Sequence, residues 1–375
     1  MNDLIITLVK PSDPTLDSRL IKEAGSIKKK GYSANIISMH KWNADSKKYD
    51  QIEACQTFNL GLNTNKGFKS LFLWPIWWAY EFYSLFTVKS DIFHVINYNS
   101  VLPALIVGRI RRIPVIYEML DTTYDTRDLP KKVRSLVMRL DKYLMSWSDA
   151  VILVDEKQAV EFGGIPNPNV SVIYDTALDF AHNASVEDVG DGTFLIIYVG
   201  TLYKSRKLNL DLLVQTIKNL EGIKFIVAGY GDLVEDIKIW ETESKGKVEY
   251  IGSLDYSEAL KLSLKASCLV VLRDSNIITN RFICGSKIWE AMMCGKPILV
   301  NSKTSTADKV LREKCGMVVD VNDLPELEKT IVLLKDNPDL CRQMGQNGRN
   351  AYEERYSWDL MEERLLNLYL HLAER

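Results

Sequence analysis

The stretch NRFICGSKIWEAMMCGKPILVN, residues 280–301, decides the fold of this chain. It predicts a turn, a helix that begins near Ser286 and ends at Gly-Lys-Pro, and an apolar strand over 298–300. Backbone N–H groups at a helix start attract anions such as a diphosphate, and Glu290, one turn inside, can accept two hydrogen bonds from a ribose. The segment therefore suits a nucleotide-sugar. The alternative is a surface helix that Ser286 merely caps, with Glu290 solvated.

Five segments of the C-terminal half occur in the order found in family 4 retaining glycosyltransferases. They are IIYVGTLYKSRKLNLDLLVQ, KFIVAGYGDLVEDI, VEYIGSLDYSEALKLSLKASCLVVL, SKIWEAMMCGKPILV and NPDLCRQMGQNGRNAYEERYSWDLMEERLLNLY. From about Phe194 to the C-terminus the chain resembles this family, and the resemblance is weaker before that residue. It implies the GT-B architecture, an α/β fold in which two Rossmann-like domains face each other across a cleft and the C-terminal helix crosses back to the N-terminal domain.

The domain organisation follows from this resemblance and from the pattern of the sequence. We expect an acceptor-binding N-terminal domain over 1–178, a polar linker over 179–193, a nucleotide-sugar-binding domain over 194–356, and a helix over 357–375 that packs on the N-terminal domain. Strands separated by helices give a parallel sheet. In the N-terminal domain they are expected, around a helix at 17–30, at residues 4–9, 33–38, 92–96, 115–117 and 150–154.

Composition and charge narrow the classes of partner. The 375 residues suffice for two domains, and 46% hydrophobic with 26% charged residues is typical of a soluble globular protein. Residues 1–150 hold 21 Lys and Arg against 15 Asp and Glu, and the remainder holds 26 against 34. This modest basic excess, without an aromatic-basic repeat, argues against a nucleic-acid partner and favours an anionic membrane surface.

The cysteines and the N-terminus predict the compartment. The six cysteines show no close pairs and no metal-ligand spacing, which indicates a reducing environment. The N-terminus begins as a strand rather than as a signal segment, so we expect a cytoplasmic protein. Because the sequence contains no Asp-x-Asp, we expect no required metal.

An apolar segment, LFLWPIWWAYEFYSLFTV at residues 71–88, approaches the length of a membrane span. Strands on either side leave no room for a span, so a buried or an interfacial helix is expected instead. Lysines precede the segment, and its three tryptophans prefer the headgroup region. These residues are Lys66, Lys69, Trp74, Trp77 and Trp78.

A second segment, residues 129–147, predicts an amphipathic helix with basic edges. Its apolar stripe is Val133, Leu136, Val137, Leu140, Tyr143, Leu144 and Trp147. Ordinary core is the alternative use of this stripe. Beside the aromatic segment, however, the basic edges favour peripheral membrane contact through 66–88 and 129–147, at the cytoplasmic membrane face.

The resemblance implies a basic pair after the strand that ends at Gly200. Thr201 stands where the family usually has arginine, so Lys204, Arg206 or Lys207 must supply the charge that a leaving diphosphate needs. We favour Arg206, whose planar fork can hold two phosphate oxygens. Lys287 would be the second cation.

The donor-binding residues implied by the resemblance line the loops of the C-terminal domain. Glu290 is the residue expected to hold the ribose, and the base would lie against loops at 229–231 and 252–254. The full set is Gly200, Thr201, Lys207, Tyr230, Gly231, Ser253, Leu254, Arg281, Gly285, Ser286 and Glu290.

The chain departs from the family pattern at two places. The first of the family's two glutamates, eight residues before Glu290, is Phe282 here, whereas Asn280, Arg281, Lys287 and Glu290 fit a subset with Asn-Arg and Lys-x-x-Glu. In the N-terminal domain, Leu120 occupies the place of a catalytic-site histidine. Asp121 is then the nearest ionisable group, or else it caps a turn.

Two other N-terminal features have competing interpretations. His94 lies in an apolar strand and is expected to be a satisfied core histidine rather than a base. Asp17 and Arg19 match in part an Asp-x-Arg pattern of the family, with a helix cap and a solvated arginine as the alternative.

These observations lead to a functional hypothesis. The chain is expected to be a retaining hexosyltransferase that moves a sugar from a nucleoside-diphosphate sugar to a glycan or polyprenyl-linked acceptor, by front-face attack and with no cofactor beyond that co-substrate. The alternatives are an isomerase resembling nucleotide-sugar 2-epimerases and an inactive donor-binding subunit of a glycan assembly.

Overall fold

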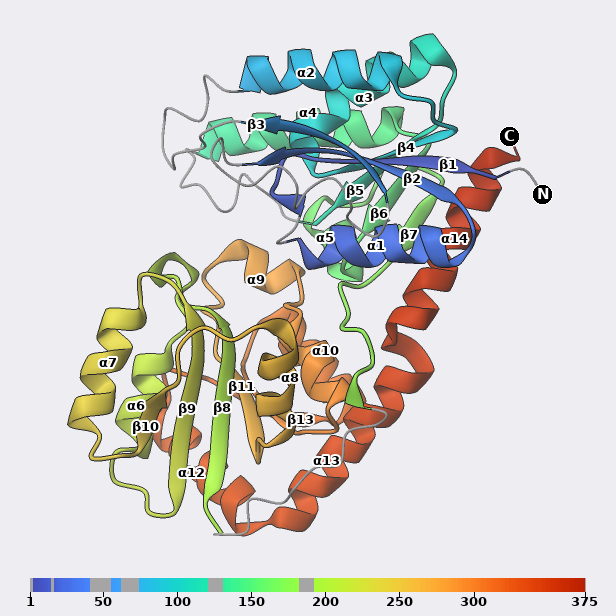
Figure 1. The fold of residues 1–375 in the computed structure, drawn as a ribbon. Coiled ribbons are helices and arrows are strands. Elements are labelled where there is room, and N and C mark those ends of the chain that lie inside the picture. Colours follow the sequence, from blue (N-terminus) through green and yellow to red (C-terminus); the bar gives the residue numbers. More distant parts are fainter. Residues whose placement is uncertain are drawn as a thin grey trace. The chain divides into compact units, whose positions relative to one another are not determined.

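The computed structural model describes residues 3–14, 17–40, 55–61, 74–120, 131–181 and 192–374. The chain divides into two compact units. Unit 1 is Met1–Tyr174 together with Met361–Arg375, and unit 2 is Asp175–Leu360. Each unit has a parallel sheet with helices on both faces, which confirms the α/β prediction (Figure 1).

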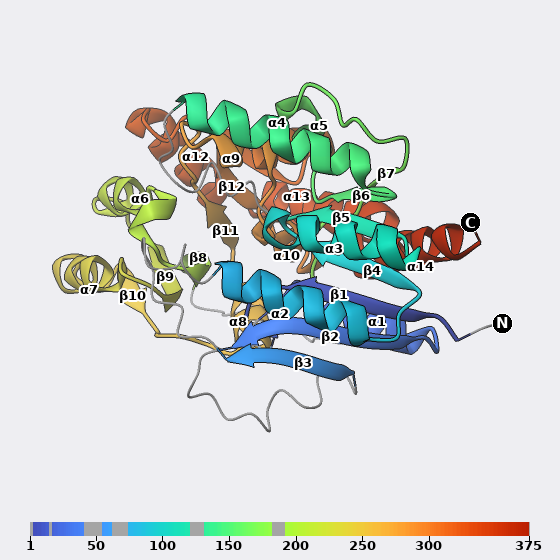
Figure 2. The same cartoon turned by 90° about the horizontal axis from the view of Figure 1, so that it is seen from above.

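Unit 1 contains, within its described residues, a seven-stranded parallel sheet in the order β3-β2-β1-β4-β5-β6-β7. Its strands are β1 (Ile5–Lys10), β2 (Ser33–His40), β3 (Gln56–Gly61), β4 (Ile92–Ile96), β5 (Val115–Met119), β6 (Ala150–Leu153) and β7 (Val170–Val172). Its helices are α1 (Ser18–Lys29), α2 (Trp74–Thr87), α3 (Tyr98–Arg111), α4 (Lys131–Trp147), α5 (Glu156–Glu161) and most of α14 (Trp358–Ala373). Figure 2 shows α2, α3 and α4 lying across one face of this sheet.

The strands of unit 1 form because their apolar runs are buried on both faces. In β4 all five residues are buried, with Phe93 and Val95 in the core under α2 and α3. The five strands expected from the sequence are present with bounds shifted by at most two residues. Two strands were absent from the prediction, the edge strands β3 and β7.

The first turn of α1 shows where Asp17 and Arg19 lie. Asp17 is the N-cap residue of α1, and its carboxylate accepts a hydrogen bond of 3.1 Å from the Leu20 backbone N–H. This confirms the helix-cap interpretation. The expectation of a solvated arginine is wrong, because Arg19 is buried.

The aromatic side chains of helix α2 are partly buried and partly exposed. The side chain of Trp77 is fully buried and donates a hydrogen bond of 2.9 Å to the Ser100 hydroxyl, so the expectation that it lies in lipid headgroups is wrong. Trp78, Tyr83 and Phe86 are exposed. None of the described helices has the length and hydropathy needed to cross a membrane, and residues 66–73 lie outside the described part.

Helix α4 divides the predicted stripe into two halves. Leu144 is buried in the core of unit 1, as the core interpretation requires. Val133, Leu136, Leu140 and Tyr143 are exposed instead. Packing in the core of unit 1 does not explain why these four apolar side chains lie on the exposed side of α4.

Unit 2 contains, within its described residues, a six-stranded parallel sheet in the order β10-β9-β8-β11-β12-β13. Its strands are β8 (Phe194–Thr201), β9 (Ile223–Tyr230), β10 (Val248–Tyr250), β11 (Cys268–Val271), β12 (Ile298–Asn301) and β13 (Gly316–Val319). Its helical segments are η5 (Lys204–Arg206), α6 (Leu210–Ile217), α7 (Val234–Glu243), α8 (Tyr256–Leu264), α9 (Ile278–Phe282), α10 (Lys287–Met293), α11 (Ser305–Glu313), α12 (Leu324–Asp336), α13 (Pro338–Ala351) and the π-helical turn η6 (Tyr352–Tyr356).

The sheet of unit 2 places its loops at one edge. Because the strands are parallel, the loops that follow β8, β9 and β11 all leave from the carboxyl ends of adjacent strands. In open α/β sheets this edge is where ligands bind. Side chains of α6 and α12 fill the core on one face of the sheet, and α8 and α10 contact the other face.

The C-terminal helix returns to unit 1, as the resemblance implied. Its residues Met361, Leu365 and Tyr369 are buried, and the Tyr369 hydroxyl shares a hydrogen bond of 2.7 Å with His94 Nδ1. Lys29 of α1 forms an ion pair of 2.8 Å with Glu362. Helix α14 is therefore part of the core of unit 1 rather than an appendage.

Candidate functional site

Helix α10 presents an ionic pair at the carboxyl edge of the sheet of unit 2. The Lys287 ammonium lies 2.8 Å from Oε1 and 2.7 Å from Oε2 of Glu290, so one cation holds both carboxylate oxygens. Glu290 is 6% exposed and the Lys287 side chain is 26% exposed. The surface-helix alternative is wrong on both counts, because Glu290 is paired rather than solvated and the Ser286 side chain makes no capping bond.

The space behind this pair is closed. Ile197 and Val199 of β8, residues 269–271 of β11 and Ser263 of α8 line a cavity of about 10 Å³ beside Lys287 and Glu290. A cavity of this size holds at most one water molecule. A ligand of nucleotide size therefore does not fit into this space.

Two glycines let the loops at the strand ends approach each other. A Cβ atom on Gly229 would stand 1.8 Å from the Gly200 carbonyl oxygen, and one on Gly231 would stand 2.1 Å from the Leu202 oxygen. The Leu233 N–H donates to the same Leu202 oxygen at 2.9 Å. These positions require glycine, and they bring the loops after β8 and β9 into direct contact.

The three basic residues after β8, Lys204, Arg206 and Lys207, differ in their ionic partners. Lys204 turns toward α7, where its ammonium lies 2.5 Å from Asp236, and Lys207 lies 3.6 Å from Asp274. Arg206, in contrast, forms no ion pair with any residue in the described part of the chain. Of the three candidates for binding phosphate, the arginine is therefore the one whose charge is not already matched by a carboxylate.

Arg273, two residues after β11, was not among the site residues predicted from the sequence. Its guanidinium lies against Gly285, where a Cβ atom would be 3.0 Å from its Cζ. Burial raises the pKa of the Tyr198 hydroxyl, the positive charges of Arg273 and Arg206 oppose the rise, and Glu290 adds to it. Both arginines and Glu290 therefore act on the same phenol. A lone arginine after a strand carries no sequence signal that would have revealed this.

Helix α9 is held by its own polar side chains. Asn280 is buried and donates a hydrogen bond of 2.8 Å to the Asp274 carbonyl, and Arg281 donates one of 2.6 Å to the Ser275 carbonyl. Both residues thus fix the loop between β11 and α9. Phe282, at the place of the family's first glutamate, is half-buried, so no carboxylate stands at that position.

The residues expected against a nucleoside base lie at the end of β9 and on the loops after β9 and β10. The Tyr230 ring is exposed and meets the Tyr203 ring edge-on, with centroids 6.3 Å apart. Ser253 is exposed and Leu254 is half-buried, just before α8. The Gly229 N–H donates to the Gly252 oxygen at 2.8 Å, which joins these two loops. The remaining catalytic candidate, Asp121, lies outside the described residues.

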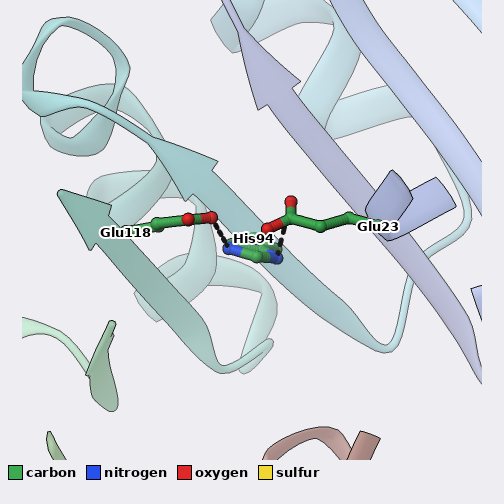
Figure 3. Close-up of side chains that lie close together, drawn as sticks. All are labelled: Glu23, His94 and Glu118. Carbon is green, nitrogen blue, oxygen red and sulfur yellow. Dashed lines mark ion pairs between the residues drawn. The ribbon is translucent and has the colours of Figure 1, made fainter. Parts of the chain in front are cut away.

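Unit 1 has an ionic cluster of a different kind, and Figure 3 shows the His94 ring between the carboxylates of Glu23 and Glu118. His94 Nε2 lies 2.9 Å from Glu118, and Arg19 Nε lies 2.7 Å from Glu23. The same Arg19 Nε donates a hydrogen bond of 2.9 Å to Glu118. His94 also shares the hydrogen bond with Tyr369, which confirms that it is a satisfied core histidine.

The charges of this cluster balance without a metal ion. Although burial pushes the pKa of Glu118 upward, Arg19 and His94 hold it well below its usual range. Burial and the neighbouring Glu118 raise the pKa of Glu23 well above its usual range, which favours the protonated form of Glu23. The spacing of Glu23, His94 and Glu118 would suit a divalent ion. The Arg19 guanidinium, in contact with both carboxylates, already supplies the positive charge such an ion would bring.

Unit 2 contains the residues that match a known protein family. The family model Glycosyl transferases group 1 matches residues 180–351, which carry every described residue of the site around Glu290. Unit 2 is a group 1 glycosyltransferase domain. This confirms the resemblance to family 4 glycosyltransferases.

Individual relatives match about half of the chain, and solved structures match nearly all of it. A GDP-mannose-dependent monoacylated phosphatidylinositol monomannoside mannosyltransferase from Corynebacterium glutamicum is 24% identical over 41% of this chain and 40% of its own length. The chain spans about half the length of the curated relatives it matches, from 40% to 61%.

Two solved structures match nearly the whole chain and confirm the GT-B fold. Sucrose-phosphate synthase from Thermosynechococcus elongatus aligns with a TM-score of 0.78 at 16% identity, covering 98% of this chain and 99% of its own. HepE from Anabaena, solved in complex with UDP and glucose, aligns with a TM-score of 0.74 at 16% identity, covering 98% and 100%.

Proposed function

We propose that this protein is a retaining glycosyltransferase that transfers a hexosyl group from a nucleoside-diphosphate sugar to a lipid-linked or membrane-proximal glycan acceptor. The observation that carries the proposal is the Lys287–Glu290 pair, which lies in the group 1 glycosyltransferase domain and is open to solvent through Lys287. Arg206, with no carboxylate partner among the described residues, adds a positive charge near the same strand ends.

In this proposal Glu290 binds the ribose of the donor. Both of its oxygens are held by Lys287 in the structure, and in this proposal the ammonium leaves the carboxylate as the donor binds. The freed Lys287 then turns toward the diphosphate, and Glu290 accepts hydrogen bonds from the ribose hydroxyls. The exchange leaves neither group without partners, because the lysine gains phosphate oxygens as it loses carboxylate oxygens, and the carboxylate gains hydroxyl donors from the ribose.

Breaking the bond between sugar and diphosphate places negative charge on the leaving oxygen. Lys287 and Arg206 stabilise that charge, so the reaction needs no metal ion for this purpose. The leaving phosphate takes the proton of the acceptor hydroxyl on the same face of the sugar, and the protein contributes orientation and charge rather than a strong base. Asp121 is retained as a proposed acceptor-side group.

The exposed half of α4 supports a membrane-bound acceptor at the cytoplasmic face. Leu136, on the outside of this helix, is 67% exposed, and Lys132 and Arg139 flank the apolar row. A helix with exposed apolar side chains between basic ones lies at the surface of a membrane that contains anionic lipid. The Corynebacterium mannosyltransferase, by its name, acts on a lipid-anchored acceptor.

Incubation with donors tests the catalytic proposal. UDP-glucose and GDP-mannose, with and without a polyprenyl-linked acceptor, should give transfer with the donor anomeric configuration kept, as judged by NMR of the product. Glu290→Ala should abolish transfer while the fold stays intact. Formation of an epimer would show an isomerase, and binding without turnover would show a donor-binding subunit; either result contradicts the proposal.

Vesicle sedimentation tests the membrane proposal separately. The double variant Leu136→Gln/Leu140→Gln should bind vesicles containing phosphatidylglycerol more weakly than the wild type. Leu311→Gln is the matched control, because Leu311 of α11 is 62% exposed but lies in unit 2. Equal binding by the wild type and the α4 variant would exclude α4 as the contact.

A further inference from the structure

The backbone of Arg273 is fixed from two sides. On one side, the Asp274 N–H donates to the Lys207 oxygen at 3.1 Å and the Asn209 amide donates to the Leu272 oxygen at 2.7 Å. On the other, the Asn301 amide donates to the Arg273 oxygen at 2.9 Å. The loop that carries Arg273 is therefore tied to the loop that carries the basic run after β8.

The Arg273 side chain depends on a glycine for its position. A Cβ atom on Gly285 would stand 3.0 Å from Cζ and 3.1 Å from both terminal nitrogens, so the guanidinium lies flat over the Gly285 backbone. Gly285 does not have a left-handed φ, so an alanine there would be tolerated by the backbone. Alanine at this position would displace the guanidinium and little else.

Charges of the same sign converge on this point. Arg273 and Arg206 both act on the Tyr198 hydroxyl, and a Cβ atom on Gly200 would meet that hydroxyl at 3.2 Å and Lys287 Cε at 3.3 Å. The Lys287–Glu290 pair thus adjoins the phenol on which the charges of both arginines act. Because Lys287 is already paired with Glu290, the two arginines supply the net positive charge that suits an anion with several oxygens.

We propose that Arg273 binds the diphosphate of the donor, in place of the arginine that this chain lacks at Thr201, and that Gly285 is the residue that makes room for it. The proposal rests on the proposed function. A guanidinium presents two parallel N–H donors to two phosphate oxygens, and Arg206 and Arg273 would hold the diphosphate from adjacent loops.

Titrations with UDP, GDP and the corresponding nucleosides test this role. For the diphosphate that binds the wild type, Arg273→Met should weaken binding roughly tenfold or more, while the affinity for the nucleoside stays unchanged. Arg273→Lys should lose part of the affinity, because an ammonium cannot form the double contact. Gly285→Ala should shift affinity in the same direction as Arg273→Met. Arg342→Met on α13 is the control arginine.

The outcomes separate this proposal from the proposed function. If the wild type binds neither UDP nor GDP, the donor site itself is refuted. If the wild type binds but Arg273→Met retains full affinity, only the role of Arg273 is refuted. An equal loss for nucleoside and diphosphate would indicate a merely structural residue and would also overturn it. Should Arg273→Met fail to fold, Arg273→Lys and Gly285→Ala decide by the same criterion.

Discussion

The two ionic clusters of this protein use similar groups in opposite ways. In unit 1, Glu23, His94 and Glu118 are fully buried around Arg19, and every charge is matched inside the core. In unit 2, a lysine holds a glutamate at the edge of the sheet, and part of the lysine is exposed. The difference shows that access, rather than the kind of side chain, separates a group of charges that stabilises a fold from one that can exchange partners with a ligand.

The largest effect is expected from removing the cation of the closed cluster. Arg19→Met leaves the ionised Glu118 buried without its counter-charge, which should cost about 3–5 kcal/mol of unfolding free energy. Urea unfolding measures this loss. The double variant Arg19→Met/Glu118→Gln should recover part of it, and a loss under about 1 kcal/mol in the single variant would show that the cluster does not stabilise unit 1.

Substitution in the Lys287–Glu290 pair should change ligand affinity instead. Glu290→Ala removes the acceptor of the ribose hydrogen bonds, so donor affinity should fall roughly tenfold or more, with a smaller change in stability. Isothermal titration measures the affinity. Glu313→Gln is the control, since Glu313 is also buried in unit 2 but is paired with Arg355 and Tyr356. Equal affinity in the wild type and Glu290→Ala would remove the contrast between the clusters.

The pH dependence of stability should expose the protonated member of the closed cluster. The folded pKa of Glu23 lies above its ordinary value of 4.5, so stability falls as the pH rises from there toward the folded pKa. Glu23→Gln should flatten this decline, whose slope is at most about 1.4 kcal/mol per pH unit.

Urea midpoints of both proteins from acid to neutral pH provide the measurement. Stability lost below pH 4.5 through the lowered pKa of Glu118 should persist in the variant, because that loss belongs to a different carboxylate. Parallel curves for the two proteins above pH 4.5 would mean that Glu23 is already ionised in the folded state.

The smallest effect is expected from the matched lysine. Lys287→Met leaves Glu290, which is 6% exposed, to be solvated only from the side on which the lysine reaches water, so the unfolding free energy should fall by about 1–2 kcal/mol, below the effect of Arg19→Met. Urea unfolding of the two variants side by side compares them directly. A loss as large as that of Arg19→Met would place the unit 2 pair among the structural clusters.

The sequence predicted what depends on local pattern. The helix of Glu290 and the strands around it follow from apolar runs and a polar helix start, and five strands of unit 1 were found in the same way. Strand β7 escaped because it has only three residues, and β3 lies at the sheet edge with few buried residues. Short or half-exposed strands lack the periodicity that such prediction needs.

Local sequence patterns could not predict contacts between residues that are distant along the chain. Arg19 was a charged residue on a helix in the sequence, and only the packing of α1 against β5 shows that it is buried on Glu118. The Arg273 guanidinium likewise lies against Gly285, which follows α9, and its charge acts on Tyr198 of another strand. The sequence could separate neither the buried Trp77 from the exposed Trp78 nor the two halves of the α4 stripe.

The return of α14 to unit 1 sets an order on how the chain can mature on the ribosome. All of residues 175–360 are synthesised before the segment that supplies Tyr369 to His94. Unit 2 can therefore fold as one continuous stretch, while unit 1 retains an apolar gap until α14 has been synthesised. A nascent chain that stalls before this helix leaves that gap open, so incomplete products expose a hydrophobic surface to chaperones and proteases.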